Sequence, residues 1–426
     1  MISRRSIAAL QHRNFRLIWA GLLFSHTGSM MQSAGLLWHV SLLVPPDKKG
    51  LGLGIVGLVR FLPIVVFSLV SGMVADAVNR RRLMLVTQSA AASVALLLAV
   101  LTFRGAPPVW QVYALAAVGA GVSTFDMPAR QALVPTLVPR EHLPNAINLN
   151  MIMFQTASVA GPALAGILIA AAGVGWVYVA DAISFGFVIV ALLMMDGRSP
   201  GGEIRKPKPD HDPISLAAAF EGLRFVFRAP LIRSTMLLDF FATFFSSATA
   251  LLPIYAQDIL RVGPHGYGWL YAAPAVGAVL ASLVLIAVTE RIDRRGGALL
   301  WAVTGYGVAT VVFGVSRSFW LSFACLALTG ITDTVSAVLR SIIRNLETPD
   351  RLRGRMIGIN MVFFVGGPQL GEFEAGAAAA LFGATASVVT GGLGCLAATA
   401  WIAWSTPAIR HYRQAHAQPI EVSSGA

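Results

Sequence analysis

Long apolar stretches alternate with short polar segments along nearly the whole chain. A helix that crosses a bilayer needs about twenty apolar residues, and twelve stretches approach or exceed that length. Because a helix satisfies its own backbone hydrogen bonds, such stretches predict membrane-spanning helices, and the chain is predicted to be an all-α membrane protein. The predicted spans are residues 17–43, 52–74, 83–103, 109–128, 147–172, 175–195, 232–256, 267–288, 298–315, 319–339, 357–381 and 384–405.

The longest polar interruption, residues 196–229, divides these spans into two sets of six. Its centre is rich in Lys, Arg, Pro and Gly and cannot form a hydrophobic core, so we expect a flexible cytoplasmic linker there. Residues 214–227 carry apolar side chains at helical spacing and predict a short helix on the membrane surface. We therefore expect one six-helix bundle in residues 1–195 and a second, with a short cytoplasmic tail, in residues 230–426.

Weak internal similarity supports this division. Arg130 aligns with Arg340 at an offset of 210 residues, and Asp76 aligns with Glu290 at an offset of 214. Loop insertions produce small changes in offset of this kind. The two halves are therefore predicted to be repeats of one unit.

Composition argues against a soluble protein. Of the 426 residues, 56% are hydrophobic and only 12% are charged, whereas soluble domains carry about 25% charged residues. The net charge of +12 raises the alternative of a nucleic-acid-binding protein, but the Lys and Arg residues lie in short gaps between apolar stretches, so we expect no nucleic acid. Cys325 and Cys395 lie within apolar stretches and are predicted to be packing thiols.

The distribution of positive charge predicts the orientation. If the N-terminus is cytoplasmic, most Lys and Arg residues fall on the cytoplasmic side, as the positive-inside rule requires. The exceptions in the outer loops are Lys48, Lys49, Arg104, Arg261 and Arg317. The first apolar stretch is too long for a cleaved signal. We predict a multi-pass protein of the cell inner membrane with both termini in the cytoplasm.

The loop between the second and third spans carries the pattern Gly72-x-x-x-Asp76-x-x-x-Arg80-Arg81-Arg82. A triple arginine is too costly to lie in hydrocarbon and must reach water. The pattern resembles the loop signature of the Major Facilitator Superfamily. The glycine of this signature lets neighbouring helices approach closely, and the arginines are expected to hold Asp76 and to bind lipid headgroups. A purely topological anchor is the alternative role for the arginines.

Asp76 ends its helix where the helix predicted at 357–381 begins. The positive N-terminal dipole of that helix is therefore expected to meet the carboxylate. Such a contact braces the cytoplasmic side and favours an outward-open state, so these loop residues form a predicted conformational switch. Glu290 is expected to repeat the contact against the helix at 147–172.

The fifth predicted helix carries Gly161-Pro162-Ala163-Leu164-Ala165-Gly166. Proline bends a helix, and glycines open a groove for close packing. The stretch resembles the G-P-x-x-G-G signature of antiporters of the superfamily, with Ala165 in place of one glycine. This resemblance implies export. An ordinary packing kink is the alternative.

Further stretches resemble one branch of the superfamily, which contains the enterobactin exporter and macrolide efflux proteins. They are residues 126–141 in the loop after the fourth span, Asn14–Leu17 near the start and Arg353–Gly358 near the end. The resemblance covers most of the chain. It implies twelve transmembrane helices in two six-helix bundles and secondary active transport.

Ionisable residues at membrane depth are candidate functional residues. Arg60 lies near the middle of the second span and is expected to bind an anionic substrate group or a buried carboxylate. A proton antiporter also needs a buried carboxylate that titrates near neutral pH. The candidates, in order of preference, are Glu374, Asp239, Glu372 and Asp181, with His26 as the candidate proton relay.

Two acidic residues lie near the predicted inner ends of their helices, each followed by an arginine. Asp126 precedes Arg130 by one helical turn, and Asp333 precedes Arg340 by two. Each pair is expected to act either as a structural gate or in proton transfer.

The predicted function is export of an amphipathic small molecule, such as a siderophore or drug, by proton antiport and alternating access. Importing by the same fold and a non-transporting sensor or scaffold are the alternatives. No zinc-protease, nucleophile-elbow or phosphate-loop pattern occurs in the sequence, so neither catalysis nor a cofactor nor a metal is expected. The expected partners are the substrate, protons and the lipid bilayer, and one chain suffices for the pathway, which predicts a monomer.

Overall fold

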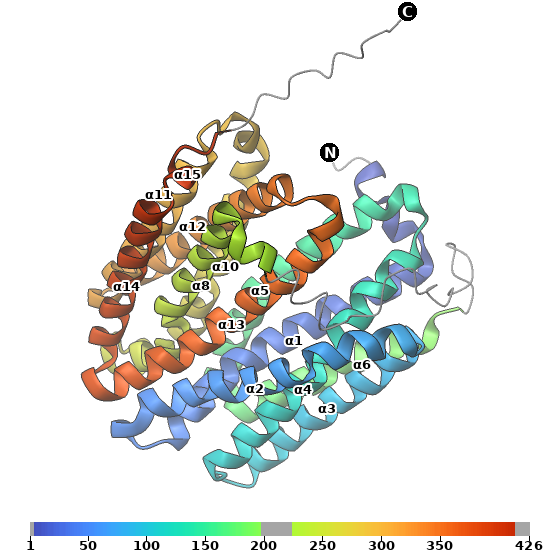
Figure 1. The fold of residues 1–426 in the computed structure, drawn as a ribbon. Helices are drawn as coiled ribbons and strands as arrows, with labels where there is room; N and C mark the ends of the chain where they lie inside the picture. Colours follow the sequence, from blue (N-terminus) through green and yellow to red (C-terminus); the bar gives the residue numbers. More distant parts are fainter. Residues whose placement is uncertain (1–3, 197–223, 414–426) are drawn as a thin grey trace, which may run out of the picture.

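Residues 4–196 and 224–413 are described by a computed structural model, in which they are almost entirely helical and contain no strand (Figure 1). The first half of the chain forms η1 (Arg4–Gln11), α1 (Arg13–Leu43), η2 (Pro46–Lys48), α2 (Lys49–Ala77), α3 (Arg80–Phe103), α4 (Val109–Leu133), η3 (Val134–Leu137), η4 (Arg140–His142), α5 (Leu143–Ala172) and α6 (Val174–Met194). The second half forms α8 (Pro230–Phe245), η5 (Ala248–Leu251), α9 (Leu252–Ile254), the π-helix η6 (Tyr255–Ile259), α10 (Gly263–Val288), η7 (Thr289–Arg291), α11 (Arg295–Val315), α12 (Phe319–Glu347), α13 (Asp350–Phe382), α14 (Ala384–Ser405) and α15 (Pro407–Arg410). Most of the predicted linker, the greater part of the predicted surface helix at 214–227 and the tail lie outside the described residues.

Nine helical segments among the described residues are long and apolar enough to cross a membrane, and each overlaps a predicted span. The other three predicted spans correspond to α1, α4 and α13, which are 31, 25 and 33 residues long. These helices contain ionisable residues, among them His26, Asp126 and Glu372. The protein is therefore a multi-pass membrane protein.

The span predicted at residues 232–256 is confirmed as one candidate membrane span, Pro230–Ile259, but its helix is interrupted. The helix α8 ends at Phe245, and three short elements follow it to Ile259. Pro253 lies in the first turn of α9, a position that proline tolerates because its missing amide hydrogen would have no helical partner there. The last of the three elements is a π-helix, a conformation found frequently at functional sites.

The helices pack in the same order in the two halves. In the first half, α1 packs on α5 and α6, α2 on α4, and α3 on α4 and α6. In the second half, α8 packs on α13 and α14, α10 on α12, and α11 on α12 and α14. Figure 1 shows these two groups side by side, coloured blue to green and yellow to red.

Two helix pairs, α2 with α13 and α5 with α10, make the main contacts between the halves. Glycines lie at the closest approaches. A Cβ added at Gly54 of α2 would lie 3.0 Å from Cα of Gly376, and one added at Gly166 of α5 would lie 2.9 Å from Cα of Gly268. Backbones can approach this closely only where side chains are absent, so these glycines determine how the two halves meet.

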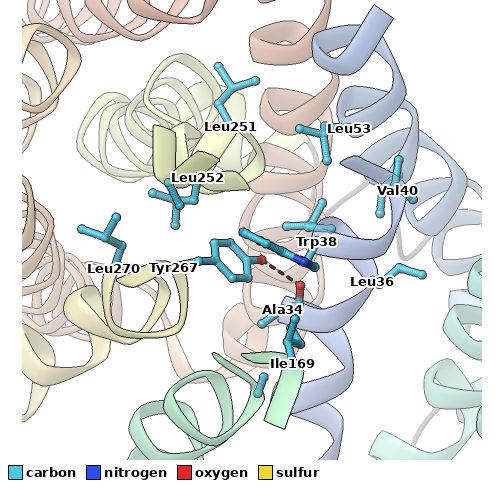
Figure 2. Close-up of a cluster of buried hydrophobic side chains, with 14 of the residues drawn as sticks. Ala34, Leu36, Trp38, Val40, Leu53, Ile169, Leu251, Leu252, Tyr267 and Leu270 are labelled. Carbon is cyan, nitrogen blue, oxygen red and sulfur yellow. Dashed lines mark hydrogen bonds between the residues drawn. The ribbon is translucent and has the colours of Figure 1, made fainter. Parts of the chain in front are cut away.

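We call the end of the molecule where α2 ends and α3 begins, at Arg80, the basic end, and the opposite end the far end. The glycine contacts between the halves lie toward the far end. At the far end, Tyr267 donates a 2.7 Å hydrogen bond to the Ala34 carbonyl oxygen, as Figure 2 shows. The surrounding apolar cluster takes Trp38 from the first half and Leu252 from the second (Figure 2). The core thus continues across the junction at this end.

A polar contact also joins the halves at the far end. Nζ of Lys49, at the start of α2, lies 3.1 Å from Oδ2 of Asp258 in the π-helix η6. The neighbouring Gln257 accepts a hydrogen bond from Lys49 and donates one of 2.8 Å to Oγ of Ser41. The π-helix therefore holds two side chains of the second half against α1 and α2 of the first.

Candidate functional site

Charged residues of both halves meet where α2 packs on α13. A Cβ added at Gly57 would lie 2.7 Å from Cβ of Glu372, so the α2 backbone lies directly against this glutamate. Arg60, almost one turn further along α2, is close enough to interact electrostatically with Glu372 and with Tyr271 of α10. Oε2 of Glu372 is shielded from solvent and makes no hydrogen bond with the described residues. This carboxylate therefore lies between the halves, within electrostatic range of a cation of the other half, and the two form no direct ion pair among the described residues.

Glu374, the preferred proton carrier by sequence, lies two residues further along α13. Like Glu372, it is partly buried and makes no ion pair or hydrogen bond with other described residues. Residues two apart on a helix point to different sides. Of the two glutamates, Glu372 is the one that lies against the other half.

A second polar cluster lies inside the first half. Arg130 of α4 pairs with Asp126 one turn earlier at 2.5 Å and contacts the imidazole of His26 on α1. Asp126 also accepts hydrogen bonds from Thr87, at 2.8 Å, and Gln88, at 2.9 Å, both on α3. The cluster thus ties three helices together and satisfies the buried carboxylate.

An equivalent cluster lies inside the second half. Nη2 of Arg340 on α12 lies 2.9 Å from Oδ1 of Asp239 on α8 and 3.6 Å from Oδ1 of Asp333. The side chains of Arg340 and Asp239 are 3% and 4% exposed. A small cavity of about 110 Å³ opens beside Asp333 and Tyr306, which is room for several water molecules.

The two arginines occupy equivalent positions of the internal repeat, and each contacts the first long helix of its own half. The partner is His26 for Arg130 and Asp239 for Arg340. Sequence analysis proposed each of these four residues separately but did not pair Asp239 with Arg340 or His26 with Arg130. The internal repeat could have predicted these pairs. It aligns α1 with α8 and α4 with α12, so a contact between α1 and α4 implies an equivalent contact between α8 and α12.

Asp181 lies away from the junction of the halves. It is fully buried on α6 beside Gly28 of α1, where a Cβ would lie 2.7 Å from its Oδ1. Ser184 donates a hydrogen bond to Oδ1, and Oδ2 makes none with the described residues. The position within the first half makes Asp181 a weaker candidate for coupling the two halves.

The antiporter-like stretch of α5 contacts two neighbours. A Cβ at Gly161 would lie 2.5 Å from Cβ of Met30 on α1, and one at Gly166 would lie 2.6 Å from the Pro264 oxygen on α10. The Pro162 oxygen would in turn lie 2.6 Å from a Cβ at Gly268. One face of the stretch therefore fixes α5 within the first half, and the other forms the junction with the second half.

The loop pattern at the basic end is partly described. Asn79 caps α3 by accepting hydrogen bonds from the amides of Arg81 and Arg82, as Asn at an N-cap commonly does. Arg80 donates to the Ala132 oxygen at 2.9 Å, and Arg81 donates to the Leu193 oxygen at 3.2 Å. The side chains therefore join the α2–α3 loop to the ends of α4 and α6.

The switch residues themselves make few described contacts. No described atom lies within 4 Å of a Cβ added at Gly72. Asp76 lies in α2, and its side chain is outside the described set. Glu290 is exposed in η7, just after α10, and has no ion-pair partner among the described residues. The predicted contacts of both acidic residues with helix N-termini stay predictions.

A family model of the Major Facilitator Superfamily described as "Transmembrane secretion effector" matches residues 4–421. The chain belongs to this superfamily. The enterobactin exporter EntS of Escherichia coli (strain K12) is 27% identical over 346 residues, which are 81% of each chain, and that of Shigella dysenteriae serotype 1 gives the same values. Its relatives are transporters, so the protein is a transporter of the superfamily.

Solved structures give the fold independently of sequence. A bacterial homologue of the human lysosomal transporter Spinster, in an inward-facing and unoccupied conformation, superposes with a TM-score of 0.71 at 14% identity and covers 95% of this chain and 99% of its own. A bacterial homologue of the iron transporter ferroportin, inward-facing, gives 0.64 at 16% identity, with 91% and 98% covered. This superfamily fold places the Arg60–Glu372 cluster between two halves of a transporter.

Proposed function

We propose that the protein exports an amphipathic small molecule in exchange for protons by alternating access. In this proposal twelve transmembrane helices form two six-helix bundles, residues 1–195 and 230–426, joined by a cytoplasmic linker at 196–229. Both termini and the basic end face the cytoplasm, in agreement with the positive-inside rule. The matching order of helix contacts in the two halves supports this division.

The observation that carries the proposal is the one-sided contact between the halves. Among the described side chains, the α2–α13 contact extends from Gly50 at the far end to Phe61 and Gly366 near the middle of the helices. At Gly72, nearer the basic end, no described atom lies within 4 Å of an added Cβ. Helices that meet through glycines can shift against each other without breaking side-chain interlocks, so the far end can open while the basic end closes.

Glu372 is the proton carrier in this proposal. When ionised, it attracts Arg60 of the other half in a poorly solvated environment, where such an attraction is strong. Protonation removes the attraction and weakens the contact that keeps the far end closed. Asp239 is less suitable because Arg340 of the same half neutralises it at 2.9 Å, and that ion pair does not cross between the halves.

The cargo is expected to combine an aromatic or apolar body with an acidic group. Phe240 of α8 stacks on Phe244 at 5.5 Å and meets Phe363 of α13 edge-on at 6.0 Å, and such rings suit aromatic ligands. Arg60 supplies a cation for an acidic group. Export is favoured by the antiporter-like stretch of α5 and by the enterobactin exporters among the relatives.

Transport into inside-out membrane vesicles under an imposed pH gradient tests this function. Siderophores and hydrophobic drugs serve as the panel of substrates. An acidic vesicle interior is expected to drive accumulation of an acidic, aromatic compound in vesicles that contain the protein. Accumulation that ignores the pH gradient would refute proton antiport, and accumulation only in right-side-out vesicles would indicate an importer.

The same assay separates the two glutamates of α13. Glu372→Gln is expected to lower gradient-driven accumulation by at least about tenfold while substrate-for-substrate exchange continues. Glu374→Gln is the matched control, two residues away on another side of the helix, and is expected to stay within about twofold of the parent. Equal losses in the two variants would contradict the assignment of Glu372.

A further inference from the structure

A groove of about 520 Å³ lies between α11 and α14. These two helices pack on each other, and Figure 1 shows them, with α15, at an outer edge of the molecule. Arg410, the last residue of α15, closes the groove at the basic end. The groove is thus separate from the junction between the halves.

The walls of the groove are apolar. Small residues create the space. No described atom lies within 4 Å of a Cβ added at Gly297, and Ala400 and Ala403 line the opposite helix. The two lining threonines, Thr304 and Thr399, donate their hydroxyl groups to backbone oxygens of their own helices. The hydroxyl groups of both threonines are therefore already used within their own helices, and the remaining lining of α11 and α14 is aliphatic apart from the indole of Trp301.

The length of the groove matches one leaflet of a bilayer. Its deepest lining residue on α14 is Leu396, and α14 ends at Ser405. Nine residues of helix rise by about 14 Å, which is close to half of the roughly 30 Å hydrocarbon core. Trp301 and Trp404 are 77% and 76% exposed near the same end, as expected for aromatic residues at the membrane–water interface.

Charge is present only at the mouth of the groove. Arg410 is exposed and makes no ion pair or hydrogen bond with the described residues. Arg294 and Arg413 are also exposed at this end. The groove therefore combines an apolar channel one leaflet deep with an available guanidinium at headgroup level.

We propose that this groove binds an anionic phospholipid of the leaflet at the basic end. One acyl chain lies between α11 and α14 along Leu300 and Leu396, and the phosphate pairs with Arg410.

Native mass spectrometry of the full chain, titrated with phosphatidylglycerol and with phosphatidylcholine of the same acyl chains, tests the proposal. Arg410→Gln is expected to weaken phosphatidylglycerol binding by about fivefold, the contribution of one arginine near the membrane surface, and to weaken phosphatidylcholine binding less, because choline offsets the charge of the phosphate. Arg317→Gln, an exposed arginine at the other end of α11, is the matched control and is expected to change neither.

Ala400→Trp fills the groove from an exposed position and is therefore expected to fold. It should reduce binding of both lipids and keep the melting temperature of the parent. Undiminished phosphatidylglycerol binding in either Arg410→Gln or Ala400→Trp would overturn the proposal. Release of the lipid by inorganic phosphate alone would also overturn it, because the acyl chain would then contribute nothing.

Discussion

Arg340 of α12 and Asp239 of α8 form an ion pair at 2.9 Å in which both side chains are almost completely buried. Taking two charges out of water costs several kcal/mol per ion, and only close pairing offsets that cost. The pair is equivalent to the contact of Arg130 with His26 in the first half. Each half of the protein therefore holds its first long helix through an arginine.

Removal of one member of the Arg340–Asp239 pair should be more damaging than removal of both. Asp239→Asn or Arg340→Gln alone leaves a buried charge without its partner and is expected to cost about 3–5 kcal/mol of stability. The double variant is expected to cost less than either single variant, because it leaves no unpaired charge of this pair. Thermal unfolding of the three purified variants measures this coupling. Additive losses would show that the two side chains do not depend on each other.

Close approach of α5 and α10 at the far end should be essential for transport. Gly166→Val places a Cβ 2.6 Å from the Pro264 oxygen, and such overpacking typically costs about 1–3 kcal/mol, so the transport rate should fall by about tenfold or more. Gly186→Val on α6 is the control, because nothing lies within 4 Å of its added Cβ. Initial rates in vesicles at matched protein content give the comparison, and similar rates for the two variants would contradict the role of this glycine.

Asp76→Asn should slow efflux while insertion into the membrane stays normal. Loss of a carboxylate at a helix N-terminus is worth about 1 kcal/mol, which corresponds to a rate loss of about fivefold if the contact forms in the transport cycle. Asp47→Asn, an exposed aspartate at the far end, serves as control. Unchanged efflux in Asp76→Asn would refute the predicted brace.

The basic end should loosen slightly on acidification. Nε2 of His12 lies 2.9 Å from Nδ1 of His142, which joins the start of α1 to the start of α5. Burial and the neighbouring His142 lower the pKa of His12 below the ordinary value of 6.5, and Glu141 opposes this shift. A lowered histidine pKa means that the folded protein favours the neutral ring. The stabilisation is present above pH 6.5 and is lost as the pH falls through the folded-state pKa.

The melting temperature of the parent is therefore expected to fall by up to about 2 °C more than that of His12→Gln between pH 7.5 and pH 5. His411→Gln is a suitable control, since His411 is exposed and bonded only to its own helix end. Scanning fluorimetry at fixed ionic strength measures the difference. If the melting temperatures of the parent and of His12→Gln change equally with pH, the His12–His142 contact has no role in this pH dependence.

Much of the fold was accessible from the sequence, because membrane helices are long and apolar. Nine predicted spans are confirmed by helices of suitable length and composition. The glycines of the α5 stretch were also recognisable, since small residues mark close helix contacts. The break after Phe245 was missed, because serine and alanine at residues 246–248 and a proline at 253 are all tolerated in membrane helices and leave hydropathy high.

Pairing of side chains was not accessible in the same way. Which residue faces Arg340 depends on the rotation of α8 and α12 about their own axes, and that rotation is determined by packing of all the neighbouring helices. The same applies to which of the two glutamates of α13 lies against α2. The depth of a residue in the membrane can be counted along the sequence. The side of α13 that meets α2 cannot be determined in this way.

The most direct test of alternating access joins the two halves reversibly at the far end. Lys49→Cys and Asp258→Cys replace an ion pair that crosses between the halves, and a short, cleavable bifunctional thiol reagent can link them. Arg13→Cys with Asp196→Cys replaces an ion pair within the first half and serves as control. The account predicts that linking the first pair stops transport, that cleavage restores it, and that linking the control pair has no effect. Continued transport with the first pair fully linked would contradict it.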